Sequence, residues 1–517
     1  MHLSPHSLQQ IDDAYIESLD PEALRGLSLR LLADLKEAWD RLNQGPENSS
    51  RPPSSRVPWD RKCGRPDPEA DAMVADGEGE AKPAEAKPAE AKPVEVKPVE
   101  VKPARKPGQQ PGAPGRGRTQ VFHAHEEQAH YPTACGGCGH ALTGAGAVAY
   151  TGFQAVDLRW GDPRQPGLTL WVVDHRYYEA ACGCGHRTRA VPGQGEVDPL
   201  LAGIDLSEWR LVGPGLAALI VALALRFRLS RARIREFLAD WLGLELSVGV
   251  IHQTIHEASA AVAPAEQELV QAILASDRLH ADETAWPEQG QPLWLWVFCS
   301  VTVTLYYVAG RGRELVENVL DGFTGWLMSD GWIAYRHYPC RLRCWAHLIR
   351  KARGLAQSCD REARFFGQQV LKTLEALMAA VYAAREGPPA VDVPTQHAPA
   401  LAELRAACEH YQRSDHGKTH ALAVELLNDW AAIFAVLSHP ELPLTNNDAE
   451  RALRHWVILR KLSLGTRTPV GSRVVALLAS VIDTCRQRGH APWRYLERAI
   501  ADRRAGRSLT ALPQPGE

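Results

Sequence analysis

A repeat of Lys, Glu and Pro limits where this chain can build a folded core. The string EAKPAEAKPAEAKPVEVKPVEVKPARKP occupies residues 80–107 and places a proline at almost every fifth position. Proline removes a backbone donor that a helix needs, and the alternating charges leave little apolar surface to bury. We therefore expect residues 45–119, which also include a Pro- and Ser-rich stretch, to form a disordered linker.

The segment before this linker, residues 1–44, is rich in leucine. Leu24, Leu27, Leu31 and Leu35 recur at spacings of three and four residues, which is typical of an amphipathic helix. The segment is too short to prove a coiled coil. Two interpretations stay open, a helix that pairs with another chain and a helix that packs on its own domain.

Composition sets the broad class of the protein. The chain has 517 residues, a net charge of −3 and 45% hydrophobic residues, as expected for several globular domains. We expect no membrane segment, because the longest apolar run, residues 211–227, is interrupted early by Gly and Pro and ends in arginine. The first 15 residues lack the pattern of a signal peptide, which predicts a cytoplasmic location. Residues 441–507 contain 13 Lys and Arg against 6 Asp and Glu, a local excess that suits phosphate contacts.

The chain has four cysteines in two close pairs: Cys135 with Cys138, and Cys182 with Cys184. Paired cysteines in a cytosolic chain indicate a metal site rather than disulfides. Tetrahedral Zn²⁺ suits four thiolates in a small β-rich unit over residues 120–200. His140 or His186, each two residues after a pair, could replace one cysteine. The second pair has the spacing CxC instead of the commoner CxxC.

Residues 201–275 have helical periodicity. Two amphipathic segments are joined by LGLEL, and Ser247 is a suitable N-cap for the second. This pattern predicts a helix-turn-helix-like domain that contacts DNA. Two packed helices without that function would give the same pattern.

From residue 276 the pattern changes to strands. DRLHADETAW is the first, residues 292–310 read as a hairpin of two strands, and WLMSDGWIAY and CRLRCWAH contain the fourth and fifth. Helical stretches over residues 313–323 and 346–356 alternate with them. We therefore predict an α/β multidomain protein with an RNase H-like core in residues 276–358, a helical insertion in 359–440, C-terminal core helices in 441–500 and a tail in 501–517.

Three acidic residues stand where strands or helices are expected to end or begin. Asp282 and Asp330 lie at or near the ends of apolar, strand-like runs, and Glu450 lies early in a helix-like run. Carboxylates that converge in a fold are the ligands of a two-metal site for phosphoryl transfer, with Mg²⁺ or Mn²⁺ as the ion. Glu283 and Asp448, which stand beside two of these acids, are alternative ligands.

The helix around Glu450 has further polar residues. Asn446 or Asn447 is a natural N-cap for it. Arg454 lies four residues after Glu450, on the same helix face, where it can orient the carboxylate or meet a phosphate.

Several strings together resemble the insertion sequence 66 family of bacterial transposases. They are DET at Asp282, DGWIAY followed by CWAHLIRKA, and NNDAERALRHWVILRK followed by GSRVVALLASVIDTCRQRGHAPWRYLERAI. The upstream strings NSSRPPSS and RKPGQQPGAPGRGR are also similar to that family, whereas the KPAEA repeat is not. The resemblance runs from about Ala23 to Ile500. It implies an RNase H-like transposase whose DDE triad is Asp282, Asp330 and Glu450.

The resemblance also implies further site residues. Cys344 and His347 form a Cys-x-x-His string after the second acid, so His347 is expected near the site, where it could position a phosphate or a water. Candidate contacts to DNA phosphates are Arg350, Lys351, Arg451, Arg454, Arg460 and Lys461. The expected partners are the DNA of the element ends and target, a second copy of the chain and accessory proteins of the same element, in association with the nucleoid. A DNA-binding protein without catalysis, or a related nuclease, is the alternative.

Overall fold

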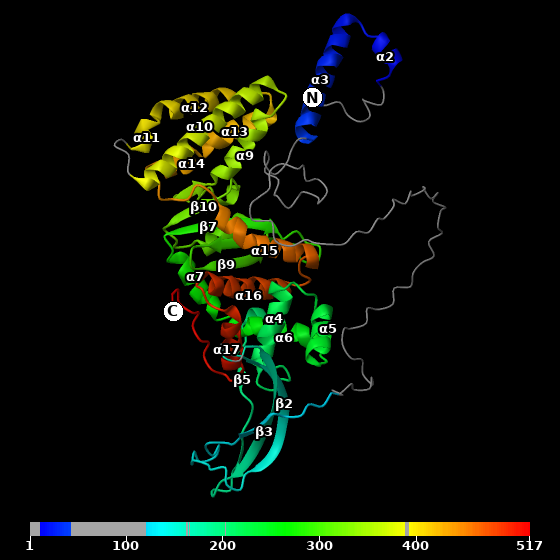
Figure 1. Cartoon of the computed structure of the whole chain (residues 1–517), viewed down its shortest axis with the longest axis vertical. Helices are drawn as coiled ribbons and strands as arrows, with labels where there is room; N and C mark the ends of the chain where they lie inside the picture. The colour runs from blue at the N-terminus through cyan, green and yellow to red at the C-terminus, as the bar shows by residue number, and fades with distance from the viewer. Residues whose placement is uncertain are drawn as a thin grey trace. The chain divides into compact units, whose positions relative to one another are not determined.

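The computed structural model describes residues 11–42, 120–161, 164, 166–201, 203–387 and 392–516. The predicted linker therefore lies almost wholly outside the described residues. All the elements that follow belong to one unit of the chain, made of Met1–Ser55 and Phe122–Glu517. Figure 1 shows these elements coloured from the N-terminus to the C-terminus.

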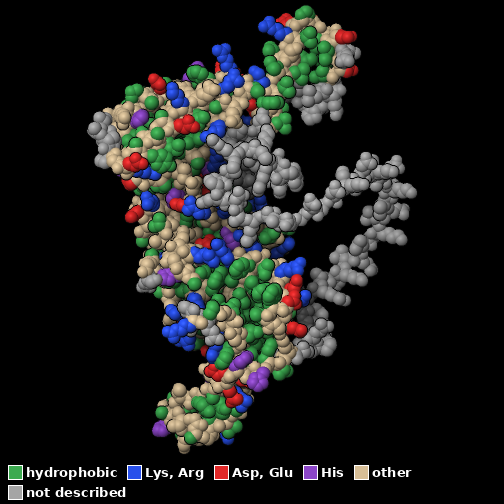
Figure 2. Space-filling view, in the orientation of Figure 1, with side chains coloured by type: hydrophobic (Ala, Val, Ile, Leu, Met, Phe, Trp, Pro, Cys, Tyr) green, Lys and Arg blue, Asp and Glu red, His purple; other side chains and the backbone are tan. Residues whose placement is uncertain are grey.

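The N-terminal segment forms two helices, α2 (Asp13–Glu17) and α3 (Pro21–Leu42), where the sequence had predicted one. The break has a local cause. The Asp20 carboxylate accepts the backbone N–H groups of Glu22 and Ala23 at 2.9 and 2.7 Å, and a proline follows it at the first helical position. Large apolar side chains of α3 remain exposed, among them Leu29 and Leu35 at 60% and 67% (Figure 2). Pairing of α3 with a second chain stays a prediction.

A four-stranded sheet follows. Its strands are β1 (Glu126–His130), β2 (Val148–Trp160), β3 (Leu168–Ala181) and β4 (Arg187–Arg189). β2 and β3 form a long antiparallel hairpin, β1 adds parallel to β3, and β4 adds antiparallel to β3. The predicted strand over residues 168–180 is confirmed as β3. A two-stranded sheet of β5 (Gln194–Gly195) and β6 (Leu206–Ser207) connects this unit to the helices that follow.

The predicted pair of amphipathic helices is confirmed as α5 (Arg231–Leu242) and α6 (Val248–Val262), between α4 (Pro214–Val221) and α7 (Ala265–Leu274). The Oγ of Ser247 accepts the N–H of Val250 at 3.1 Å and so caps α6. Gly243 ends α5 with φ 61°, a left-handed value that glycine adopts without strain. α4 and α6 bury their apolar faces against α16 (Pro469–Gln487) and α17 (Pro492–Arg504) from the far end of the chain.

The central sheet has five strands: β7 (Arg278–Ala285), β8 (Trp294–Cys299), β9 (Thr304–Ala309), β10 (Trp326–Ser329) and β11 (Arg341–Arg343). Their order is β11-β10-β7-β8-β9. β7, β8 and β9 are antiparallel neighbours, whereas β10 runs parallel to β7 and β11 runs parallel to β10. All five predicted strands, including the hairpin, are confirmed. The crossovers and flanks carry α8 (Arg313–Val319) and α9 (Trp345–Ala356).

Helices fill the predicted insertion. They are α10 (Arg361–Glu386), α11 (Val393–Gln396), α12 (Ala398–Tyr411), α13 (Gly417–Asn428) and α14 (Trp430–Ser438) (Figure 1). Their apolar side chains form a second core together with β11 and the buried face of α9. The chain then returns to the sheet, where α15 (Asn447–Ser463) packs on β7 and α16 packs on β9.

Among the described residues, no single helix has both the length and the apolar character needed to cross a membrane. The bent pair α13 and α14 passes the same criterion when the two helices are taken together.

Candidate active site and metal centres

The register of two parallel strands brings the first two predicted acids together. Met328 of β10 pairs with His280 of β7. Two residues further along both strands, Asp330 therefore stands beside Asp282. Neighbouring strands lie about 4.8 Å apart, so the two carboxyl groups share one location at the end of this strand pair. Both residues are half-buried.

The third acid reaches the same place from a helix. α15 packs on β7, and Glu450 lies in its first turn. Burial raises the pKa of Asp282 well above its usual range, and the negative charges of Asp330, Glu283 and Glu450 raise it further. The structure thus brings Asp282, Asp330 and Glu450 within electrostatic reach of one another.

Asn446 fixes where α15 begins. Its side chain is fully buried, and its amide nitrogen donates to the Ala281 carbonyl on β7 at 2.8 Å. Its amide oxygen faces Nδ1 of His280 at 3.2 Å, and its backbone N–H donates to the Sγ of Cys344 at 3.2 Å. Asn446 occupies the N-cap position without making a side-chain cap bond. It instead ties the helix of Glu450 to the strand of Asp282 and to the start of α9, whereas Asn447 is exposed.

The alternative acid on β7 has protein partners. The Glu283 side chain is 1% exposed, and it accepts hydrogen bonds from Arg311 at 2.8 Å and from the Tyr335 hydroxyl at 3.0 Å. Arg311 also lies over the ring of Trp332 at 3.7 Å, and the backbone N–H of Trp332 donates to the Asp330 carboxylate at 2.8 Å. Arg311 thereby links the segment of Asp282 to the loop of Asp330.

The alternative acid on α15 also has protein partners. Asp448 pairs with Arg451 at 3.2 Å and lies 3.5 Å from Nε2 of His280, with its side chain half exposed. By contrast, Asp282 accepts only the N–H of Glu283 among the hydrogen bonds that the structure shows for its carboxylate. Glu450 Oε1 is shielded from solvent and has no hydrogen-bond partner among the described residues.

His347 lies in the first turn of α9 beside Glu450. Its Nδ1 is 3.9 Å from Glu450 Oε1, and Arg350 is 3.8 Å from the same oxygen. Burial, with help from the positive charge of Arg350, lowers the pKa of His347 to about 4. The imidazole is therefore neutral at physiological pH and has a lone pair to offer a cation or the O–H of a water.

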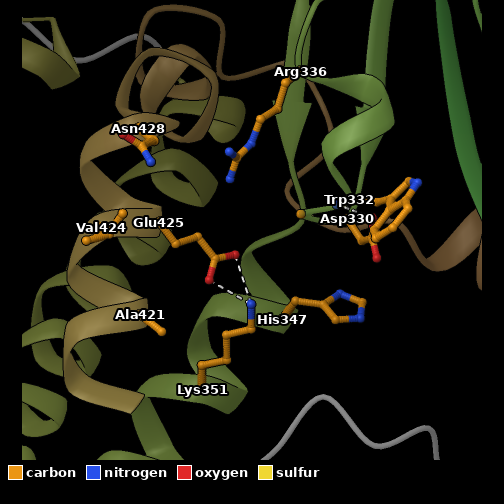
Figure 3. Close-up of a pocket in the computed structure, with 10 residues that line it drawn as sticks. Asp330, Trp332, Arg336, His347, Lys351, Ala421, Val424, Glu425 and Asn428 are labelled. Carbon is orange, nitrogen blue, oxygen red and sulfur yellow. Dashed lines mark hydrogen bonds and ion pairs between the residues drawn. The ribbon is translucent and has the colours of Figure 1, made fainter. Parts of the chain in front are cut away.

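A cavity of about 470 Å³ opens between the Asp330 loop, α9 and α13 of the insertion. Figure 3 shows His347 and Lys351 on one wall and the insertion residue Glu425 facing Lys351. The two form an ion pair with distances of 2.7 and 2.9 Å. Lys351, a predicted phosphate contact, is thus neutralised by the insertion in this structure. Arg336 points into the cavity from the other side (Figure 3).

The other predicted phosphate contacts lie on α15. Arg460 donates to the Thr284 hydroxyl at 2.8 Å and to the Ala285 carbonyl, which ties it to the end of β7. Arg451, Arg454 and Lys461 have exposed side chains. They face solvent on the helix that carries Glu450.

The four paired cysteines gather although the pairs are 44 or more residues apart. Sγ of Cys135 is 3.6 Å from that of Cys184, and Sγ of Cys138 is 3.6 Å from that of Cys182. All four sulfur atoms lie within 4.8 Å of one another, and no histidine belongs to this group within the described residues. Tetrahedral Zn²⁺ with Zn–S bonds of about 2.3 Å would place sulfurs about 3.8 Å apart. Residues of this type, number and spacing fit zinc.

The turns that hold these thiols depend on glycine. Gly139 and Gly185 follow the two pairs with φ 73° and 88°, values that side chains with a Cβ rarely adopt. Backbone N–H groups of Cys138 and Gly137 lower the pKa of Cys135 to about 6, which favours the thiolate that binds metal. The glycines beside the cysteines could be recognised in the sequence. The approach of Cys135 to Cys184 and of Cys138 to Cys182 could not be predicted from it.

From the sequence, Asn446 was predicted only as a helix cap and not as the residue that ties α15 to β7. Arg311 was not predicted as a site residue. Asn446 carried a capping signal, but its partners are 102 to 166 residues away. Arg311 stands in the Gly-rich string AGRGRE, which has no pattern specific to a site.

Comparisons with known proteins identify the family of the chain. The family described as "Transposase IS66 family" matches residues 210–474, just over half of the chain, and the match includes all three acids. The chain therefore belongs to the IS66 family of transposases. It is also similar to the uncharacterized protein y4qI of Sinorhizobium fredii, with 25% identity over 289 residues, which is 50% of this chain and 53% of that protein. The chain thus spans about half the length of the curated relative that it matches.

Membership in this family has coarse consequences for function. It supports a transposase-related role.

Proposed function

We propose that this chain is a DDE-type transposase that cuts DNA at the ends of an insertion sequence and joins those ends to a target. Asp282, Asp330 and Glu450 are its catalytic carboxylates. The observation that carries the proposal is their convergence: two lie side by side on parallel strands, and the third enters from α15. Their charges act on one another, as the raised pKa of Asp282 indicates.

The architecture supports an RNase H-like core. The sheet order β11-β10-β7-β8-β9 places the two strands of the acids next to each other in the middle of the sheet. The helices of residues 359–440 enter between the second and third acids, as an insertion does. We also assign residues 120–200 as a zinc-binding unit, because the four paired cysteines gather there. We assign residues 201–275 as a DNA-binding helical domain, because α5 and α6 form the expected pair of amphipathic helices.

A divalent ion fits the cluster of acids. The half-buried Asp282, whose pKa is raised, and the Glu450 oxygen that makes no hydrogen bond among the described residues are both stabilised by a nearby cation. Oxygen ligands are those that Mg²⁺ or Mn²⁺ prefers. When bound, a pair of such ions supplies Lewis-acid stabilisation to the attacking and leaving oxygens of an in-line displacement.

The proposed reaction has two displacements at phosphorus. A water attacks the phosphodiester at the element end, the P–O bond to the 3′ oxygen breaks, and a 3′-OH is released. This hydroxyl then attacks a target phosphodiester, so that one bond forms as another breaks. Arg311 and Tyr335 hold Glu283 away from the reacting phosphate, and His347, neutral at pH 7, orients a water or a phosphate oxygen.

DNA contacts are assigned to basic residues around this centre: Arg350, Lys351, Arg451, Arg454, Arg460 and Lys461. The exposed leucines of α3 support a homo-oligomer on DNA. We also propose that accessory proteins of the same element take part and that the protein associates with the nucleoid.

The test uses DNA that carries the sequences flanking the gene on both sides. We expect Asp282→Asn and Glu450→Gln to bind this DNA in gel shifts and to lose Mg²⁺-dependent cleavage by at least about 1000-fold. The matched control is Asp448→Asn, which changes an exposed acid two residues from Glu450 and should retain cleavage.

Three outcomes separate the alternatives. Cleavage followed by joined products supports a transposase. Cleavage without joining indicates a nuclease. DNA binding with no cleavage by the wild type indicates a non-catalytic DNA-binding protein, and full cleavage by Asp282→Asn would refute the assignment of the triad.

A further inference from the structure

A thiol, an imidazole and a carboxylate meet beside the three acids. Cys344 occupies the N-cap position of α9, His347 lies in the first turn of that helix, and Glu450 comes from α15. One ligand atom of each lies within 4.8 Å of the other two. The Cys-x-x-His spacing puts the first two on the same side of the helix, because residues three apart are neighbours on its surface.

Two of these ligand atoms lack a partner. Nδ1 of His347 and Oε1 of Glu450 are shielded from solvent and make no hydrogen bond within the described residues. They are 3.9 Å apart, which is too long for a direct hydrogen bond. A single ion between them satisfies both atoms, since ligand atoms at about 2.1 Å from a tetrahedral metal lie about 3.4 Å apart, and an approach of about 0.5 Å brings the two atoms to that separation.

We propose that Cys344, His347 and Glu450 form a separate binding site for a thiophilic divalent cation of the Zn²⁺ type. Thiolate and imidazole ligands favour Zn²⁺ or Co²⁺, whereas Mg²⁺ prefers a shell of oxygens. Three protein ligands leave a fourth position of a tetrahedron open for water or for an oxygen of the DNA.

The surroundings of the site suit a metal-bound thiolate. The buried Sγ of Cys344 accepts the backbone N–H of Asn446 at 3.2 Å, and such a hydrogen bond orients a sulfur ligand. Of the two basic residues nearby, Lys351 is neutralised by Glu425, and Arg350 lies 3.8 Å from Glu450 Oε1, so Arg350 must turn toward solvent when the ion binds. Glu450 belongs to both ligand sets, which places the two metal centres side by side.

The experiment counts metal on the full chain and needs no DNA. Protein stripped with a chelator is dialysed against Zn²⁺, and bound zinc is measured per chain. We expect Cys344→Ser and His347→Gln each to lose one equivalent relative to the wild type. The matched control Cys340→Ser, a half-buried cysteine four residues away, should lose none.

Two further variants separate this site from the other metal centres. Cys138→Ser removes the zinc of the four paired cysteines, and its loss should add to that of Cys344→Ser. Asp282→Asn, which changes an acid outside the proposed set, should keep the wild-type count. With Co²⁺ in place of Zn²⁺, the thiolate-to-cobalt absorption should fall in Cys344→Ser.

The proposal is overturned if Cys344→Ser and His347→Gln, both folded by circular dichroism, bind as much Zn²⁺ as the wild type with the same half-saturation. It is also overturned if Asp282→Asn loses the same equivalent, because the ion would then belong to the carboxylate centre. A wild type that binds this ion but never cuts DNA contradicts the proposed function and leaves this site standing.

Discussion

Asn446 offers a direct test of how the carboxylates are held together. Its amide makes two buried hydrogen bonds, one to the Ala281 carbonyl and one with Nδ1 of His280. Because the amide nitrogen donates to Ala281, the oxygen faces His280, and that ring must donate from Nδ1. Burial lowers the pKa of His280, so the ring is neutral at pH 7.

The substitution Asn446→Ala leaves both partners buried and unsatisfied. Each unsatisfied group costs about 1–3 kcal/mol, so the expected loss for the two groups is about 2–6 kcal/mol of unfolding free energy. This is a large fraction of the roughly 5–15 kcal/mol by which a protein is stable. Urea unfolding followed by circular dichroism measures it, with Asn447→Ala as the matched control, because Asn447 is the same residue type one position later and is exposed.

The substitution Asn446→Asp separates hydrogen bonding from packing. The carboxylate keeps the acceptor for His280 but places a negative charge against the Ala281 carbonyl. The pKa of the introduced aspartate should therefore be higher in the folded protein than in the unfolded chain. The protein should keep its stability at low pH and lose it as the pH rises above the usual pKa range of an aspartate. A change below about 0.5 kcal/mol for Asn446→Ala, or a stability of Asn446→Asp that does not depend on pH, would refute this reasoning.

Three further predictions rest on charge and metal. The raised pKa of Asp282 means that its ionisation destabilises the fold above the usual aspartate range, so Asp282→Asn should stabilise the metal-free protein at pH 7 by ~0.5–2 kcal/mol and the gain should vanish near pH 3 in thermal unfolding. Asp429→Ala leaves the buried Arg341 without its anion and Arg343 with Glu425 alone, and it should cost ~3–5 kcal/mol in urea unfolding, while the exposed Asp415→Ala should cost less than ~0.5 kcal/mol. Cys138→Ser should release one zinc, and either this substitution or chelation should open residues 120–190 to limited proteolysis, whereas a protected fragment pattern identical to that of the wild type would contradict a structural zinc.

Local patterns in the sequence were sufficient for most of the elements. Short strand-like runs predicted every strand of the central sheet, because each strand buries one or both faces regardless of its neighbours. The break between α2 and α3 was also readable, since Asp20 followed by a proline is a helix start signal. It was missed because the density of leucine suggested one continuous helix.

Long-range pairing could not be read from those patterns. The register of β10 against β7 decides that Asp330 meets Asp282, and no local rule sets it. The ion pair of Lys351 with Glu425 joins residues 74 positions apart. A lysine in a basic string looks like a phosphate contact until the helix that packs against it is known.

The insertion is connected to the candidate site through charge as well as through apolar packing. Arg343 on β11 is 1% exposed and pairs with Glu425 at 2.5 Å and with Asp429, both from the insertion. Buried ion pairs of this kind add little net stability, but they penalise any arrangement that separates the partners. β11 leads directly into α9, whose first turn carries Cys344 and His347.

A displacement of the insertion would therefore expose buried charges and move the helix that faces Glu450. We therefore expect the insertion and the carboxylate centre to move together. DNA that binds Lys351 or Arg336 at the cavity would therefore affect both the insertion and the carboxylate centre.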